Sequence, residues 1–200
     1  KDVLAKTFRG EVTDAPTELT KYSRDTSIFE VRPSLVTYPR DTKDVAELVR
    51  SIARAKKEGT DVSVTARSAG TCMSGGPLTH SVVAVFTKYM NKVLEVTERS
   101  ATAEPGCYYR DFEKETLKKN LILPSYPASR NIAALGGIVN NNSGGERTLE
   151  YGKTEKYVEE LEVVLSNGSV TTFKALTPDE KKKKKEQTDF EGDIYRRMRD

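Results

Sequence analysis

Short apolar runs and one long amphipathic segment alternate in the first half of the chain. The runs 35–39, 62–66 and 82–86 have the length and composition of strands, and the last is apolar throughout, as expected of a strand buried on both faces. After the first run, apolar residues recur every three or four positions on one face of a helix that begins at Asp41 or Thr42. The residues of that face are Val45, Leu48, Val49, Ile52 and Ala53. This spacing predicts a compact βαβ-type lobe.

The second half combines signals for antiparallel strands with a helix. The runs 92–96 and 101–104 read as short strands around a charged turn, and 108–119 is amphipathic and predicts a helix. Two further runs, 158–165 and 169–173, flank an Asn-Gly pair, which is a strong hairpin signal. The whole chain is therefore predicted to have an α+β fold with two lobes. An N-terminal βαβ-type lobe precedes a second lobe of antiparallel strands and helices.

These changes of pattern divide the chain into four parts. We expect an N-terminal extension over residues 1–30, a first α/β lobe over 31–90 and a second α+β lobe over 91–176. Residues 177–200 contain five consecutive lysines and are predicted to be a linker. The last residues form no closing element, so we expect a further, substrate-binding domain to follow them.

Composition and charge indicate a soluble globular protein and exclude a general nucleic-acid binder. The net charge of the 200 residues is only +3, and five of the positive charges come from Lys181–Lys185. A basic footprint for nucleic acid is therefore absent. The lysine run is most simply a solvated helix face or a mobile linker, with an acidic partner or a membrane surface as the alternative. No run approaches the ~20 apolar residues that a membrane span needs.

Two cysteines indicate the compartment. Cys72 and Cys107 belong to no C-x-x-C pair and are too few for a disulfide framework, so a reducing compartment is expected. We therefore expect a cytoplasmic protein, and leave open peripheral attachment to the inner face of a membrane. No metal site is expected.

The segment 67–78, R-S-A-G-T-C-M-S-G-G-P-L, follows the second predicted strand. Gly70, Gly75 and Gly76 can adopt positive φ, which lets successive amides point at one anion. The G-x-x-x-x-G spacing lacks the Lys-Ser/Thr of a P-loop, and no G-x-G-x-x-G is present in the chain. On the residues alone, a tight structural turn and a phosphate-binding loop are equally supported.

A second glycine-rich segment covers residues 124–152. It holds two Gly-Gly pairs, three consecutive Asn and a Tyr-Gly pair. Asn carries both donors and acceptors, and Gly permits close backbone approach, as the edge of a planar heteroaromatic ring requires. The alternative is a long irregular loop with Asn and Gly chosen for left-handed conformations, although loops of this length are more often functional.

Taken together, these segments resemble a known family. R-S-A-G-T-C-M-S-G-G-P, P-G-C, L-P-S-Y-P-A-S, L-G-G-I-V-N-N-N-S-G-G, Y-G and V-x-x-L-E-V-V-L-S-N-G follow one another between about Tyr22 and Phe173. They resemble the FAD-binding domain of the vanillyl-alcohol oxidase/p-cresol methylhydroxylase type. Within it, the chain is most similar to the FAD-linked oxidases that include D-lactate dehydrogenases and glycolate oxidase subunits.

The resemblance implies the FAD-binding portion of an oxidoreductase. Such an enzyme oxidises a 2-hydroxy acid, similar to D-lactate or glycolate, by hydride transfer to flavin N5. In the family the small-molecule substrate is held by a C-terminal domain, which also carries most catalytic residues. We therefore assign no catalytic residue here, and the electron acceptor stays unknown.

The resemblance also implies which residues hold FAD. The pyrophosphate would lie on Arg67, Ser68, Ala69, Gly70, Thr71, Cys72, Gly75 and Gly76. The adenosine side would be lined by Pro39, Gly106 and Val158. The ribityl chain and the isoalloxazine ring would lie beside Gly136, Gly137, Asn140, Ser143 and Gly144, and the segment would be closed by Tyr151 and Gly152.

Some positions depart from the family pattern. Thr71 stands where many members carry a His that bonds the flavin, and Thr cannot form that bond, so FAD is expected to bind noncovalently. Cys107 does not stand where other members attach the flavin through a Cys. Cys72 is expected to be a small loop residue, and His80, the single histidine, a surface or loop residue.

Three alternatives remain on the sequence alone. The chain could be a flavin-binding electron-transfer subunit without its own substrate site. It could also resemble a UDP-N-acetylmuramate dehydrogenase, a cell-wall precursor reductase of the same fold. The third alternative is a module that binds a nucleotide or polyanion without flavin, through the glycine loop and the lysine run.

Overall fold

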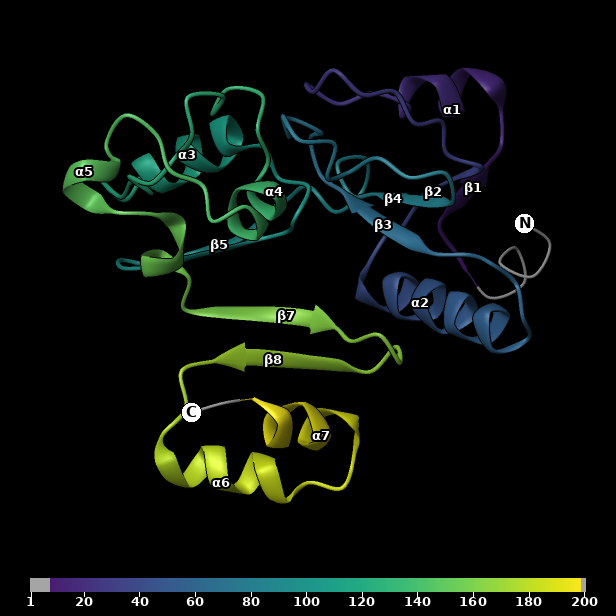
Figure 1. The fold of residues 1–200 in the computed structure, drawn as a ribbon. Coiled ribbons are helices and arrows are strands. Elements are labelled where there is room, and N and C mark those ends of the chain that lie inside the picture. Colours follow the sequence, from purple (N-terminus) through teal and green to yellow (C-terminus); the bar gives the residue numbers. More distant parts are fainter. Residues whose placement is uncertain (1–7, 199–200) are drawn as a thin grey trace.

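A four-stranded sheet forms the centre of the first lobe in the computed structural model, which describes residues 8–198. The strands are β1 (Glu11–Thr13), β2 (Leu35–Tyr38), β3 (Val64–Arg67) and β4 (Val82–Val85). Their order is β1-β2-β4-β3, with β2, β4 and β3 parallel and β1 antiparallel to β2 (Figure 1). The three strands that the apolar runs predict are confirmed, within two residues at their ends.

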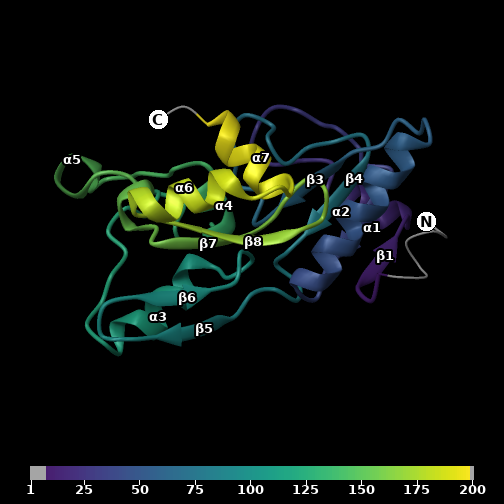
Figure 2. The same ribbon diagram turned by 90° about the horizontal axis from the view of Figure 1, so that it is seen from below.

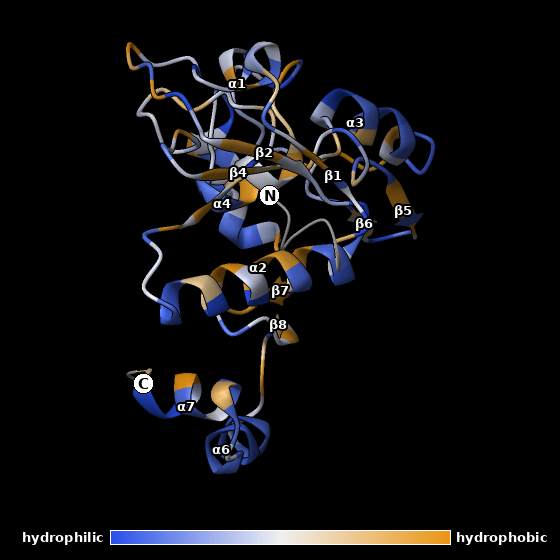
Figure 3. Cartoon of the chain, turned by 90° about the vertical axis from the view of Figure 1, so that its right-hand side faces the viewer, coloured by the Kyte–Doolittle hydropathy of each residue, from blue (hydrophilic) through white to orange (hydrophobic). Residues whose placement is uncertain are grey.

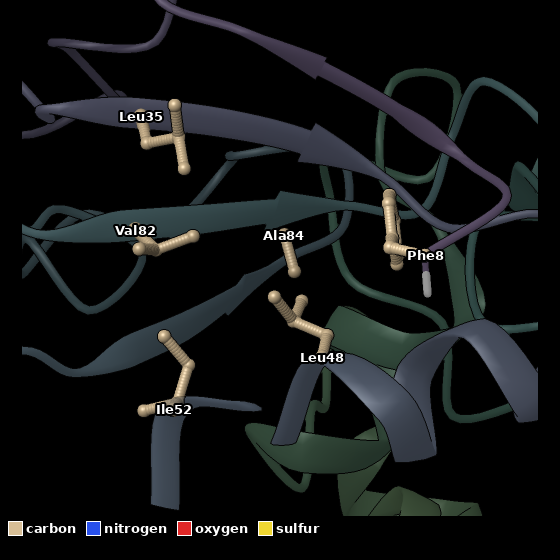
Figure 4. Close-up of a cluster of buried hydrophobic side chains, with 6 residues drawn as sticks. All are labelled: Phe8, Leu35, Leu48, Ile52, Val82 and Ala84. Atoms are coloured by element: carbon tan, nitrogen blue, oxygen red, sulfur yellow. The ribbon is translucent and has the colours of Figure 1, made fainter. Parts of the chain in front are cut away.

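Helix α2 (Thr42–Lys57) covers one face of this sheet, as its apolar face predicts. Asp41 caps the helix, because its side chain accepts a hydrogen bond from the Asp44 amide at 2.9 Å. The core between helix and sheet is a cluster of apolar side chains from β2, β4, the helix and the start of the chain (Figure 4). Its buried members are Phe8, Leu35, Leu48, Ile52, Val82 and Ala84.

The other face of the sheet is covered by α1 (Pro16–Lys21). Val36, Tyr38, Val83 and Val85 are buried there. Strand β4 is thus buried on both faces, as its continuous apolar run predicts. Both β1 and α1 come from the first 30 residues, where the sequence shows no strong periodicity.

The second lobe consists of a hairpin and short helices. Strands β5 (Val93–Val96) and β6 (Ala101–Ala103) pair antiparallel. The helices are α3 (Tyr109–Leu117), α4 (Leu135–Asn140), α5 (Thr148–Tyr151) and the 3-10 helix η2 (Thr154–Tyr157). They enclose a core of Tyr109, Tyr126, Ala133 and Ile138. The predicted α+β fold with two lobes is confirmed.

The Asn-Gly hairpin is formed by β7 (Glu160–Val164) and β8 (Val170–Lys174). It lies against α2, where Arg50 Nη2 donates to the Gly168 carbonyl at 2.9 Å. Gly168 has a φ of +81°, as the turn of such a hairpin requires.

Two helices follow the hairpin, α6 (Pro178–Glu186) and α7 (Phe190–Arg197) (Figures 1 and 2). The lysine run lies on α6, which is hydrophilic along its length (Figure 3). The Phe173 and Tyr195 rings, 6.1 Å apart, join α7 to β8. Residues 1–7 of the predicted N-terminal extension and residues 199–200 of the predicted linker lie outside the described residues. Among residues 8–198, no helix has both the length and the apolar character of a membrane span.

Candidate functional site

The loop that connects β3 to β4 begins at the carboxyl edge of the parallel strands. Residues 68–81 form this connection, and Pro39 and Phe86 follow β2 and β4 at the same edge. In open α/β sheets, ligands bind outside the carboxyl ends of the strands. The fold therefore places the first glycine-rich segment where a ligand is expected.

The backbone of this loop contains amide groups that can donate hydrogen bonds to a ligand. Gly70 and Gly75 have φ values of +74° and +78°, whereas Gly76 does not adopt positive φ. The amides of Ala69–Cys72 donate to no acceptor within residues 8–198. Four successive amides without a protein partner are unusual, because half-buried backbone donors are normally paired. They form the kind of donor set that an anion satisfies.

Arg67 is held by the protein itself. It is 7 % exposed, and its Nη2 donates to the Arg24 carbonyl at 2.7 Å. Its guanidinium carbon lies 5.3 Å from the centre of the Tyr22 ring. Burial lowers the pKa of Arg67, although a guanidinium stays charged at neutral pH. The family resemblance predicts Arg67 among the pyrophosphate ligands, whereas in the structure its guanidinium donates to carbonyls of the segment before β2.

The two glycine-rich segments meet at the carbonyl oxygen of Pro105. Ser68 Oγ donates to this oxygen at 2.8 Å from the first lobe, and the Gly136 amide donates to it at 2.8 Å from α4. A β-carbon on Gly136 would lie 2.7 Å from the same oxygen, so only glycine fits there. A β-carbon on Gly137 would be 3.7 Å from Ser68 Cβ. The structure thus brings together four of the predicted cofactor residues, namely Ser68, Gly106, Gly136 and Gly137.

Gly106 belongs to this junction because it is packed against the end of β4. Its amide donates to the Met90 carbonyl at 2.8 Å, and a β-carbon there would be 2.4 Å from the Phe86 carbonyl oxygen. Pro39, on the neighbouring strand end, is fully buried.

The second glycine-rich segment differs from the long irregular loop that its composition allows. Residues 135–140 form α4, and residues 148–151 form α5. Within the Asn run only Asn142 has positive φ, at +45°. Asn140 lies in the last turn of α4 and is exposed.

The remaining predicted residues are held by local contacts. The Ser143 carbonyl accepts from Thr154 Oγ1 at 2.8 Å, and a β-carbon on Gly144 would collide with Thr148. The Tyr151 carbonyl accepts from the Tyr157 hydroxyl, and Gly152 has a φ of +80°. Val158, which is half-buried, links η2 to β7.

The two thiols have opposite environments. Contact with Ser74, whose Oγ lies 3.2 Å from Cys72 Sγ, lowers the pKa of Cys72. Cys107 is fully buried, and this burial raises its pKa to about 11. Cys107 is therefore a neutral thiol at pH 7. His80 is exposed, as expected.

One neighbour of the loop, the segment Tyr22–Phe29, is not predicted from the sequence. Both the amide and the hydroxyl of Thr26 donate to the Cys72 carbonyl, at 3.2 and 2.8 Å. The Phe29 ring would be 3.1 Å from a β-carbon on Gly75. This segment has no periodic pattern, and its contacts are to backbone, so no sequence signal marks it.

The loop has the features that the diphosphate of a dinucleotide requires. Between residues 68 and 76 its side chains are small, apart from Met73, which is 82 % exposed, and its amides and the Thr71 hydroxyl are donors. The adjoining Gly136 and Gly137 leave no side chain between α4 and Ser68. The fold and this site define a two-lobed, α+β nucleotide-binding domain.

The chain belongs to the FAD binding domain family, whose model matches residues 33–174. It is 36 % identical over 154 residues to the glycolate oxidase subunit GlcD of Bacillus subtilis (strain 168), covering 74 % of this chain and 32 % of that protein. It is 28 % identical over 168 residues to the D-2-hydroxyglutarate dehydrogenase of Pantoea ananatis (strain AJ13355), covering 83 % and 16 %. The chain thus spans about a third and about a sixth of these relatives.

Solved structures share the fold. The 6-hydroxy-D-nicotine oxidase of Arthrobacter nicotinovorans superimposes with a TM-score of 0.70 at 22 % identity, over 84 % of this chain and 36 % of that one. At this identity the similarity establishes the two-lobed architecture.

Proposed function

We propose that this chain binds FAD noncovalently and is the cofactor-binding part of a flavin-dependent dehydrogenase or oxidase of 2-hydroxy acids. The observation that carries the proposal is the row of four amides, Ala69–Cys72, that have no acceptor within residues 8–198. Membership of the FAD binding domain family supports the cofactor. The names of the relatives, which refer to glycolate and D-2-hydroxyglutarate, support the substrate class.

Different groups of residues would bind different parts of FAD. The amides of Ala69–Cys72, together with the Thr71 hydroxyl, would hold the pyrophosphate, while Gly136 and Gly137 would let the ribityl chain and the ring approach α4. Pro39, Gly106 and Val158 would line the adenosine. When bound, FAD supplies the acceptor of the substrate hydride. The chain's own part is to bind the cofactor and orient the ring toward a substrate that we propose is held outside residues 8–198.

Noncovalent binding is supported by the chemistry of the available side chains. Thr71 has no nucleophile that can bond the flavin, and Cys107 is a buried, neutral thiol. Acid precipitation of the yellow protein should therefore release the flavin into the supernatant. Flavin that stays with the precipitated protein would contradict this part of the proposal.

The substrate class is tested on the protein expressed from its complete gene. Under anaerobic conditions, glycolate, D-lactate and D-2-hydroxyglutarate are added in turn, and the flavin absorption near 450 nm is followed, as a general property of oxidised flavins. We expect one of them to bleach the flavin. A protein that binds FAD but is bleached by none of them would fit the electron-transfer subunit, and a protein that takes up no FAD would refute the proposal as a whole.

Two free cysteines also support the proposed location. Neither Cys72 nor Cys107 forms a disulfide in the structure. This state suits a reducing compartment, so we propose the cytoplasm.

A further inference from the structure

The segment Tyr22–Phe29, here called the strap, contacts the glycine loop at Cys72 and Gly75. Thr26 bonds the Cys72 carbonyl with two donors, and the strap's own carbonyls at Tyr22 and Arg24 accept from Arg67. The strap is therefore hydrogen-bonded both to the end of β3 at Arg67 and to the loop at Cys72.

Arg67 lies between the strap and the turn at Gly70. On one side its guanidinium faces the Tyr22 ring at 5.3 Å. On the other, a β-carbon on Gly70 would lie 2.4 Å from Arg67 Nη2, so the turn rests directly on the guanidinium. Because Nη2 donates to the Arg24 carbonyl, the Arg67 side chain packs under the loop and does not point out of it toward a ligand.

Asp25 places a negative charge beside this guanidinium. Its Oδ1 accepts from the Ser27 amide at 2.8 Å, while Oδ2 is buried and has no hydrogen-bond partner within residues 8–198. Burial opposes the charged form, but the hydrogen bonds from Ser27, the nearby Gly75 amide and the Arg67 charge lower the pKa of Asp25. The carboxylate is thus ionised at neutral pH and faces the second positive-φ glycine of the loop.

We propose that Arg67 and Asp25 are positioning residues, which fix the turns at Gly70 and Gly75 from within the protein so that the Ala69–Cys72 amides converge on the FAD pyrophosphate. Neither side chain touches the cofactor. The inference rests on the proposed function, and it reassigns Arg67 from a phosphate ligand to a support for the loop.

The two roles of Arg67 predict opposite effects of Asp25→Asn. If Arg67 were a phosphate ligand, removing the nearby negative charge would strengthen FAD binding, and Arg67→Lys would retain much of the affinity through its ammonium. If Arg67 supports the loop, both substitutions weaken binding. Lysine lacks the planar fork that bonds a strap carbonyl while it lies between Tyr22 and Gly70.

The experiment measures FAD affinity by quenching of flavin fluorescence in the protein expressed from its complete gene and freed of cofactor. We expect Asp25→Asn and Arg67→Lys each to raise the Kd about tenfold or more, as expected for loss of a hydrogen bond to a charged group. The matched controls are Asp61→Asn and Arg99→Lys, both exposed, and they should leave the Kd unchanged. Unfolding in urea is recorded for each variant, and FAD is titrated only where the variant is folded.

A second measurement does not depend on the cofactor. Trypsin cleaves after Arg24, whose carbonyl is held by Arg67, so both variants should be cut there faster than the wild type. Unchanged cleavage and an unchanged or lower Kd in Asp25→Asn would overturn the inference, as would lower stability with unchanged FAD affinity. If the wild type binds no FAD, the proposed function fails instead, and the cleavage rates still decide whether the pair holds the strap.

Discussion

A hydrogen atom at position 136 is all that fits between α4 and the Pro105 carbonyl oxygen. We expect Gly136→Ala to destabilise the protein by about 1–3 kcal/mol, because the added methyl would lie 2.7 Å from that oxygen and must displace α4. Gly137→Ala is the matched control one residue further along the helix, where the methyl has 3.7 Å of space. Urea unfolding checks the difference.

The comparison removes the effect of helix propensity. Alanine is a better helix former than glycine by about 0.5–1 kcal/mol, and this gain applies equally at both positions. If the two substitutions changed the free energy of unfolding by the same amount, the close contact of Gly136 with Pro105 would not affect stability.

The thiols give a second prediction for single residues, in the form of a pH dependence. The thiolate is the reactive form, so the lowered pKa of Cys72 makes it the faster thiol, and its alkylation should speed up as the pH rises through that pKa. Cys107, with a pKa of about 11 and no exposed surface, should stay unmodified in the native protein at pH 8. Mass spectrometry after treatment with iodoacetamide locates the modified residue.

Unfolding in urea provides the control for this experiment, because both thiols should then react. Modification of Cys107 in the folded protein, at a rate close to that of Cys72, would show that the second lobe opens around it.

At the scale of an element, the stability of α2 depends on its N-cap residue, Asp41. Asp41 accepts from the Asp44 amide and forms an ion pair with Arg9. We expect Asp41→Ala to cost about 1 kcal/mol, the usual effect of losing an N-cap. Asp41→Asn keeps the cap and loses the ion pair, and since exposed ion pairs contribute little, it should cost less. Thermal unfolding of both variants distinguishes them, and equal losses would mean that the ion pair, not the cap, is what matters.

The elements also show how far the sequence predicts this fold. Helix α2 is found from its periodicity and strands β2 and β4 from their continuous apolar runs, because the apolar positions of each are the ones that the fold buries. Helix α4 is missed, since a segment with two consecutive glycines has low helix propensity. It forms because the Leu135 and Gly136 amides find acceptors on Cys107 and Pro105, and such tertiary contacts leave no local signature.

The candidate site is predictable to a similar degree. The glycine loop is located from small residues after a strand, and the family resemblance adds the partner segment around Gly136. The burial of Arg67 is not predictable, because its partners are backbone carbonyls of a segment without a pattern. The same lack of pattern hides β1, which exists only through its pairing with β2.

At the scale of the whole molecule, FAD should protect parts of both lobes together. Hydrogen–deuterium exchange with and without FAD should show slower exchange in peptides that cover 68–76 and 135–145, because the same ligand orders both. Peptides that cover α6 and α7 serve as the internal control and should be unchanged. Protection confined to the first lobe would mean that only the nucleotide half of the cofactor is held.

The Pro105 carbonyl has a consequence for how this protein can change over evolution. Its two lone pairs each accept a donor, one from Ser68 and one from Gly136, so a single main-chain atom sets the spacing of the lobes. No point substitution removes a backbone oxygen. The residue type at position 105 can therefore vary, whereas the position of its carbonyl oxygen cannot. An inserted residue is different, because it moves the chain by up to about 3.5 Å. Length variation should thus be tolerated in the exposed turn 97–100 and selected against between Glu104 and Cys107.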